Sequence, residues 1–253
     1  PLSTTYRVEK RMQIPRCLVE GRADEVRRLD ANGDDAKRSE ETVEFPVTSF
    51  VTLRRGSKIV EITTRFDNRA DNHRFRALFP TWLEATHSAA EMGFDVVERE
   101  IDRPPSSPWH GQTNPTHPQH RFVDVSDGKV GLAILNDGLR EYEVTDNDER
   151  TIAVTLMRAF EVALSTVSWR WERHPEMRLS QSPGEHEFRY AIYPHVGDWQ
   201  EGEVLEQAER WTVPMEIAQV GPHPGHLPKS LSFLQIEPSS LLLSALKRGE
   251  RSD

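Results

Sequence analysis

Short segments in which apolar and polar residues alternate dominate this sequence, and they constrain its fold more than any other feature. The clearest set lies in residues 119–144, QHRFVDVSDGKVGLAILNDGLREYEV. Three apolar alternations there are separated by SDG at 126–128 and NDG at 136–138. Asn, Asp and Gly accept the backbone conformations of tight turns, and a period of two places alternate side chains on one face of a strand. The pattern therefore predicts three consecutive antiparallel strands.

The same alternation recurs along most of the chain, so we expect an all-β protein. It is found in residues 43–53, 59–66, 75–79, 94–101, 152–156 and 188–192, and RGSK at 55–58 predicts a hairpin between the first two. Only residues 202–211 have apolar side chains at helical spacing, which predicts one short helix. Many strands in 253 residues favour a large two-layer antiparallel β-sandwich.

We divide the chain into two parts. Residues 1–213 are expected to form the sandwich domain. A Pro/Gly-rich stretch follows up to residue 228, and apolar residues then resume at Leu231. Residues 214–253 are therefore expected to be a C-terminal β segment that packs on the sandwich or begins a smaller β-domain.

Composition narrows the classes of function. The chain has 32 Lys and Arg against 41 Asp and Glu, a net charge of −9, which argues against a nucleic-acid partner. No apolar run approaches the roughly 18 residues of a membrane helix, so we expect no membrane partner. The single cysteine, Cys17, excludes an internal disulfide and favours a reducing compartment, so we expect a cytoplasmic location.

Three runs of sequence are specific enough to resemble a known family. They are residues 119–144, LRRGSKIVEITTRFDNRADNHRFRALFPT at 53–81 and FRYAIYPHVGDW at 188–199. Together they resemble the C-terminal β-region of glycoside hydrolase family 38, the retaining α-mannosidases, most closely the bacterial cytosolic α-mannosidases and mannosylglycerate hydrolases. This resemblance implies an extended sandwich similar to galactose mutarotase, a supersandwich. It covers most of residues 42–214 and continues more weakly through 230–248, whereas residues 161–185 depart from the family pattern.

The resemblance also implies a function for the parent protein and a non-catalytic role for this chain. Family members hydrolyse α-mannosides through a covalent mannosyl-enzyme, with a nucleophilic aspartate, an acid/base aspartate and zinc on an N-terminal barrel. We therefore expect the partners of this chain to be that catalytic barrel of the same polypeptide and the mannoside substrate, with a homo-oligomer as an open alternative. The isolated chain is expected to be inactive and to bind no zinc. The alternative is a free-standing carbohydrate-binding or structural β-sandwich module, and whether the native polypeptide continues upstream would discriminate the two.

Two pairs of carboxyl groups are candidates for catalysis in this chain itself. A retaining glycosidase needs two carboxyl groups about 5 Å apart, and Asp124 with Asp127, or Asp67 with Asp71, are close in sequence. Both pairs flank strand ends at turn sequences, where Asp commonly caps its own backbone. We interpret them as turn residues and expect no catalytic residue in this chain.

Histidines gather in the proline-rich segment at 104–120. His110, His117 and His120 have a spacing that could in principle hold a metal, but it lacks the helical spacing of a specific motif. The alternative is that these histidines are solvated or bonded to backbone. A mutarotase-like acid and base could be assembled from His73, His120 and Glu141, although nothing in their spacing requires it.

Two polar segments next to the family-like runs are our candidates for contact with substrate. We expect both to lie on one side of the sandwich, facing the catalytic barrel. The alternatives are a turn with internal salt bridges for the first segment and packing of the tyrosine into the sheet for the second. The candidate residues are Asn72, His73, Arg74, Arg140, Glu141 and Tyr142.

Four tryptophans admit two interpretations. Trp169 and Trp171 share one face of a strand pattern, and Trp199 and Trp211 follow near the predicted helix. Aromatic rings can stack on sugars, but aromatic residues spaced by two more often pack in a core or across strands.

Overall fold

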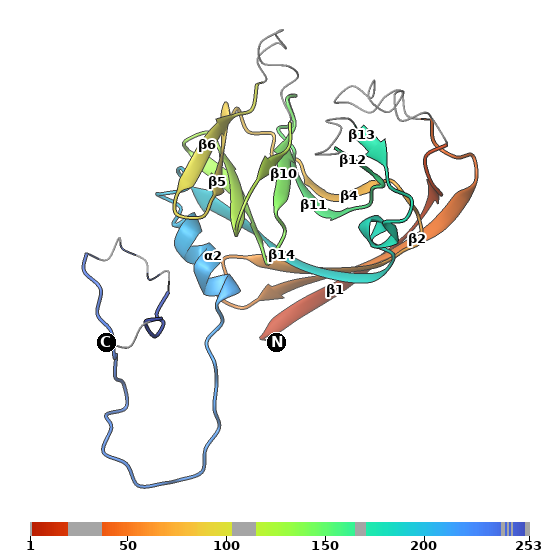
Figure 1. The fold of residues 1–253 in the computed structure, drawn as a ribbon. Coiled ribbons are helices and arrows are strands. Elements are labelled where there is room, and N and C mark those ends of the chain that lie inside the picture. Colours follow the sequence, from red (N-terminus) through yellow and green to blue (C-terminus); the bar gives the residue numbers. More distant parts are fainter. Residues whose placement is uncertain are drawn as a thin grey trace. The chain divides into compact units, whose positions relative to one another are not determined.

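The structure is a computed structural model that describes residues 2–19, 37–102, 115–164 and 171–238, together with 241, 243 and 245–250. Contacts divide the chain into two units, Pro1–Pro214 and Met215–Asp253. The first unit contains every described strand and the described helix, and Figure 1 shows its sheets as two layers. The expected all-β sandwich with one short helix is confirmed.

The larger layer is an eight-stranded antiparallel sheet. The predicted hairpins 43–66 and 122–136 are both present, joined across Val47↔Phe66 and Phe122↔Leu135. Strand β14 lies between β3 and β9 and pairs with both. In spatial order the strands are β1 (Ser3–Pro15), β2 (Thr42–Arg54), β3 (Val60–Asn68), β14 (Gly184–Val196), β9 (Val130–Asn136), β8 (Phe122–Ser126), β5 (His87–Glu91) and β6 (Val96–Glu100).

The smaller layer is a four-stranded antiparallel sheet. Its order is β4 (Arg74–Phe79), β11 (Ile152–Arg158), β10 (Glu141–Val144) and β7 (His117–Pro118). β7 is an edge strand of this sheet and contains a proline. Proline has no backbone N–H to donate, and an edge strand tolerates this because one of its sides needs no strand partner. Strands β12 (Val162–Leu164) and β13 (Trp171–Arg173) form a separate pair, followed by a 3₁₀ turn at Arg178–Gln181. His110 and Trp169 lie outside the described residues.

The main hydrophobic core lies between the two sheets. Phe45 and Phe66 of the large sheet both meet Phe75 of the small sheet, with ring centroids 5.1 and 4.9 Å apart. Ile134 of β9 and Val154 of β11 are almost completely buried in the same cluster. Burial of these apolar faces is the main force that holds the layers together.

A second, smaller core lies on the other face of the large sheet, under α2 (Val204–Thr212). Val204 and Ala208 have no exposed surface and pack in one cluster with Phe122, Leu135 and Tyr193. The helix predicted at 202–211 is therefore confirmed, and it covers the central strands on the side away from the main core. Among the described residues, no helix is both long and apolar enough to span a bilayer.

The described residues of the second unit form neither helix nor strand. The apolar residues from Leu231 onward favoured a strand in the sequence, but a strand needs a partner for its backbone hydrogen bonds. The division at residue 213 and the β character of residues 214–253 stay predictions.

Candidate functional site

The two polar segments singled out in the sequence meet at the small sheet. β4 begins at Arg74 and β10 begins at Glu141, with β11 between them. Arg74 Nη1 donates to Glu141 Oε1 at 3.3 Å, and the same carboxylate accepts from Thr155 Oγ1 at 2.8 Å and from Arg158 Nη1 at 3.2 Å. One glutamate thus joins three strands.

A second glutamate extends this network along the same face. Glu143 pairs with Arg76 at 2.7 Å and with Arg74 at 3.6 Å, and its side chain is only 12% exposed. Strand alternation puts these charges on the face opposite the core. Partial burial strengthens such pairs relative to fully exposed ones. We name this surface the charged face; it consists of Arg74, Arg76, Glu141, Glu143 and Arg158.

Tyr142 lies on the opposite side of β10 from the charged face. It has no exposed surface and belongs to the main core. Its hydroxyl lies 3.2 Å from Ser88 Oγ and 3.2 Å from Arg99 Nη1, which donates to it. The structure therefore shows Tyr142 packed between the sheets, which is the packing alternative considered from the sequence.

The three remaining candidates do not belong to the charged face. Asn72 has a positive φ of 56° and exchanges hydrogen bonds with Gln181, which holds the turn before β4. Both ring nitrogens of His73 are shielded from solvent, and burial lowers the pKa of this histidine. Arg140 Nη1 donates to the backbone oxygen of His120 at 3.4 Å. Contact between any of these residues and a substrate stays a prediction.

The structure reveals a second site that sequence reasoning missed, on the outer face of the large sheet. The register places Asp124 of β8 opposite Ala89 of β5, and Ala89 opposite Glu98 of β6. These three side chains therefore form one row across three strands. Because the middle residue is an alanine, the row has a hollow between its two carboxylates.

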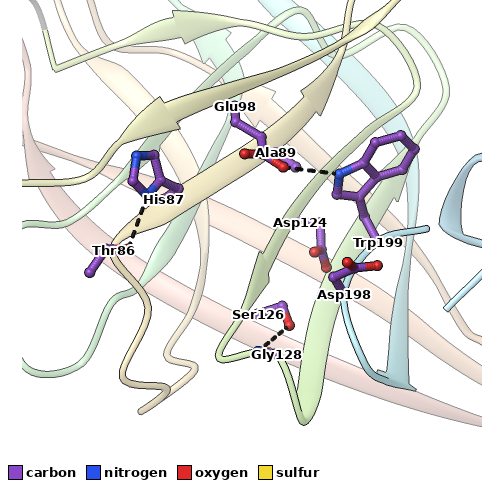
Figure 2. A pocket seen from close by; sticks show the side chains of 9 residues that line it. All are labelled: Thr86, His87, Ala89, Glu98, Asp124, Ser126, Gly128, Asp198 and Trp199. Carbon is purple, nitrogen blue, oxygen red and sulfur yellow. Dashed lines mark hydrogen bonds between the residues drawn. The ribbon is translucent and has the colours of Figure 1, made fainter. Parts of the chain in front are cut away.

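The loop that follows β14 closes one side of this hollow. Asp198 Oδ1 accepts the backbone N–H groups of Gln200 at 2.8 Å and Glu201 at 2.9 Å, which holds the loop in a turn. Trp199 Nε1 donates to Glu98 Oε1 at 3.4 Å. Figure 2 shows the side chains arranged around the resulting cavity of about 140 Å³. We name it the outer-face pocket; it is lined by Thr86, His87, Ala89, Glu98, Asp124, Ser126, Gly128, Asp198 and Trp199.

Behind this pocket lies a buried ion pair. His195 Nε2 and Asp124 Oδ1 are 2.8 Å apart, and their side chains are 1% and 2% exposed. Burial by itself lowers the pKa of His195, but the hydrogen bond and the negative charge of Asp124 outweigh it and raise this pKa above its ordinary value. His195 therefore holds its proton more readily beside Asp124 than it would free in solution.

Two glycines make room for the imidazole. In the register, His195 is opposite Gly131, so its ring crosses over a residue without a side chain to reach Asp124 on the next strand. A Cβ at Gly131 would lie 2.5 Å from His195 Nε2, and one at Gly202 would lie 2.6 Å from its Cγ. The ring is therefore held between two backbone segments, with no space for a methyl group on either side.

The carboxyl pairs considered from the sequence have different roles. Asp127 Oδ1 accepts the N–H groups of Lys129 and Val130 at 2.8 and 3.0 Å, so its interpretation as a turn residue is confirmed. Asp67 pairs with Arg69 at 2.7 Å. Asp124 is not a turn residue, and that interpretation was wrong. It stands inside β8 between Val123 and Val125, which was the available signal of a buried carboxylate that needs a partner.

The described residues do not fit a zinc site. Among them, no group of three or more His, Cys, Asp or Glu side chains could hold a metal ion. The residues of the Asp124–His195 pair bond to each other instead, and His120 Nδ1 lies 3.6 Å from Glu91. We therefore derive no chemistry through a metal in this chain.

Comparison with known families identifies the chain. Residues 26–162, more than half of its length, match the model of the glycosyl hydrolases family 38 C-terminal domain. The chain belongs to this family. The resemblance seen in the sequence is thus confirmed.

Similar proteins are much longer than this chain. A protein of Halalkalibacterium halodurans named "Putative mannosylglycerate hydrolase" is 30% identical over 249 residues, which is 97% of this chain and 26% of that protein. Alpha-mannosidase 2C1 of Mus musculus is 26% identical over 181 residues, 71% of this chain and 15% of that protein. The chain therefore spans about a quarter or less of the length of these relatives.

Solved structures agree with this assignment. An alpha-mannosidase from Enterococcus faecalis has a TM-score of 0.73 and 28% identity, with 90% of this chain and 24% of that chain covered. Another structure from Enterococcus faecalis, of a protein in the glycosyl hydrolase family 38, has a TM-score of 0.72 and 29% identity, with 90% of this chain and 25% of that chain covered. Homologues of this chain are thus glycoside hydrolases of family 38.

Proposed function

We propose that this chain is the non-catalytic sandwich portion of a retaining α-mannosidase. In this proposal the parent protein hydrolyses α-mannosides through a covalent mannosyl-enzyme. Its catalytic carboxylates and its zinc belong to an N-terminal barrel of the same polypeptide. Membership of the family 38 C-terminal domain carries the proposal, and relatives named α-mannosidases about four times as long support it. We also propose a cytoplasmic location for the parent, which rests on the single cysteine alone.

The chemistry of the described carboxylates supports a scaffold role. Glu141 and Glu143 are each held by arginines, and Asp124 is held by His195. A retaining glycosidase needs one carboxylate free to attack the sugar and a second carboxyl group free to donate a proton, about 5 Å apart. Carboxylates held by arginine or histidine side chains are less available as nucleophiles and as acids, so this arrangement favours structure over catalysis.

The proposal is tested by comparing the full-length parent protein with this chain alone. We expect the parent to hydrolyse an aryl α-mannoside and to release the α-anomer first, as proton NMR of the initial product would show. We expect the chain alone to show no turnover above buffer. Turnover by the repurified chain would refute the non-catalytic role. A natural polypeptide with a mass of about 29 kDa, that of this chain, would instead support a free-standing module.

We further propose that the charged face contacts the catalytic domain. It contains three arginines and two glutamates, so one positive charge remains for a carboxylate on a partner. Arg158 is the most exposed member, with 64% of its side chain accessible. A charge of this kind at the edge of an interface affects association of the domains more than folding of the sandwich.

A pair of matched variants tests this contact. Arg158→Gln in the full-length parent is expected to increase cleavage between the domains in limited proteolysis, while the unfolding midpoint of the isolated chain changes little. Arg65→Gln is the control, because Arg65 is similarly exposed at 60% and also pairs with one glutamate, on the large sheet. Equal proteolysis of both variants would show that the charged face is ordinary solvent-exposed surface.

A further inference from the structure

We propose that the outer-face pocket is a binding site for one pyranose ring of a saccharide, which it binds without hydrolysis. This inference goes beyond the proposed function, because it would hold equally for a mannosidase domain and for a free-standing module. It rests on three features of the pocket: its shape, its indole wall and its hydrogen-bond acceptors.

The shape limits the size of the ligand. Ala89 forms the floor, between the carboxylates of Asp124 and Glu98, and Gly128 lies at the edge. The cavity of about 140 Å³ is well below the 300–1,000 Å³ or so of sites for drug-sized molecules. It therefore accepts a single small ring, or one terminal ring of a longer chain, rather than an extended ligand.

Trp199 supplies an aromatic wall. Its indole is half-buried, and the bond from Nε1 to Glu98 fixes the ring beside the cavity, as Figure 2 shows. The ring lies in a loop that Asp198 holds in a defined turn. An aromatic wall fixed before binding suits the apolar C–H face of a pyranose, because little side-chain entropy is lost on binding.

Asp124 supplies a buried acceptor at the base of the pocket. Only 2% of this residue is exposed, and it lines the cavity. His195 occupies its Oδ1, whereas Oδ2 accepts no hydrogen bond from the described residues. The hydrogen bond with His195 fixes the carboxylate in position. A sugar hydroxyl that donates to Oδ2 would make a charge-assisted hydrogen bond, which is stronger than a neutral one.

The state of the acidic residues favours a neutral polyol over a compact cation. Asp124 is already hydrogen-bonded to His195, Asp198 accepts two backbone N–H groups, and Glu98 accepts the indole N–H of Trp199. Each carboxylate thus already has at least one hydrogen-bond donor. Hydroxyl groups can donate to the remaining lone pairs of these oxygens, and a pyranose carries several hydroxyl groups.

The test is a titration of the chain with methyl α-D-mannopyranoside, followed by the indole N–H resonances in ¹H–¹⁵N NMR spectra. We expect the Trp199 resonance to shift saturably with a dissociation constant of about 1–10 mM, as suits a ligand with few atoms. Trp82, which is 67% exposed outside the pocket, serves as an internal control. Its resonance should not shift.

Variants of the pocket decide where the sugar binds. Trp199→Ala removes the aromatic wall, and Ala89→Leu fills the hollow while it keeps the indole and both carboxylates. Each is expected to weaken binding at least tenfold. Glu100→Gln is the matched control, because Glu100 is an exposed carboxylate two residues from Glu98 on the same strand, and it should leave binding unchanged.

Three outcomes would overturn the proposal. The first is an unsaturated Trp199 shift matched by Trp82, which would show nonspecific contact of the sugar with tryptophan. The second is unchanged binding in the folded Ala89→Leu variant, which would place the sugar elsewhere. The third is a saturable shift caused by ethylammonium but not by the mannoside, which would make the pocket a cation site. If Trp199→Ala fails to fold, the Ala89→Leu variant still tests whether the sugar binds in the pocket.

Discussion

A single methyl group added at Gly131 should disrupt the buried ion pair of this domain. A Cβ there would lie 2.5 Å from His195 Nε2, and backbone at Gly202 blocks the other face of the ring. The imidazole therefore cannot slide aside and must leave its position. Gly131→Ala is thus expected to separate His195 from Asp124, a carboxylate only 2% exposed.

The cost follows from two contributions. Overpacking a well-packed interior costs about 1–3 kcal/mol. Loss of a hydrogen bond between charged groups costs about 1.5–3 kcal/mol. We therefore expect the free energy of unfolding to fall by about 2–5 kcal/mol, since relaxation of the loop would recover part of the sum. This is a large fraction of the stability of an ordinary domain, about 5–15 kcal/mol.

Urea unfolding followed by tryptophan fluorescence measures this change. Gly93→Ala is the control, because a Cβ at Gly93 would meet nothing within 4 Å and its φ is not in the positive range. We expect the free energy of unfolding of that variant to stay within about 1 kcal/mol of the wild-type value. The m-value should stay constant in both, so that a shift of midpoint reports stability alone.

A double-mutant cycle separates the proposed cause from a general effect on β9. In a His195→Ala background the obstructing ring is absent, so Gly131→Ala should cost much less than in the wild type. If Gly131→Ala costs the same in both backgrounds, the methyl group acts on the strand itself, and the reasoning from the His195 ring is wrong.

The remaining predictions concern pH and the main hydrophobic core. Because the folded pKa of His195 is raised, its stabilisation is complete below the unfolded pKa of about 6.5. It is lost as pH rises through the higher folded pKa; urea midpoints of the wild type should therefore fall as pH rises above about 6.5, and Asp124→Asn should flatten that slope. Tyr142→Phe removes the hydroxyl that lies near Ser88 and Arg99 and should lower stability by about 0.5–1.5 kcal/mol; an unchanged melting temperature would contradict this. Phe45→Ala, at a residue 1% exposed, should cost about 3–5 kcal/mol in calorimetry.

Much of the fold could be predicted because its signals are local. Alternation with a period of two and the NDG and SDG turns determine the hairpins from residues adjacent in sequence, as in β8 and β9. Helical spacing of apolar residues likewise determines α2. The same parity also assigns Tyr142 to the core face, since it alternates with Glu141 and Glu143 on a strand whose other apolar residue, Val144, is buried.

The order of the strands, by contrast, was decided by packing between distant segments. β14 inserts between β3 and β9, although it follows them by more than a hundred and by about fifty residues. Which strands become neighbours depends on how the apolar faces of the two layers fit over one core, and alternation within a strand carries no information about its neighbours.

The charged face and the Asp124–His195 pair both depend on which strands become neighbours, but to different degrees. The charged face brings together Arg74 and Glu141 at 3.3 Å. The sequence predicted only that their two segments lie on the same side of the sandwich, because both are at strand ends next to family-like runs. The partnership of Asp124 with His195, 71 residues away, was not expected. It requires β9 to lie between their strands and to have a glycine at the crossing point. The sequence by itself determined that residues 122–125 form a strand; only the tertiary structure decided that the aspartate within it is buried against His195. The partner is chosen by register and sheet order rather than by neighbouring residues.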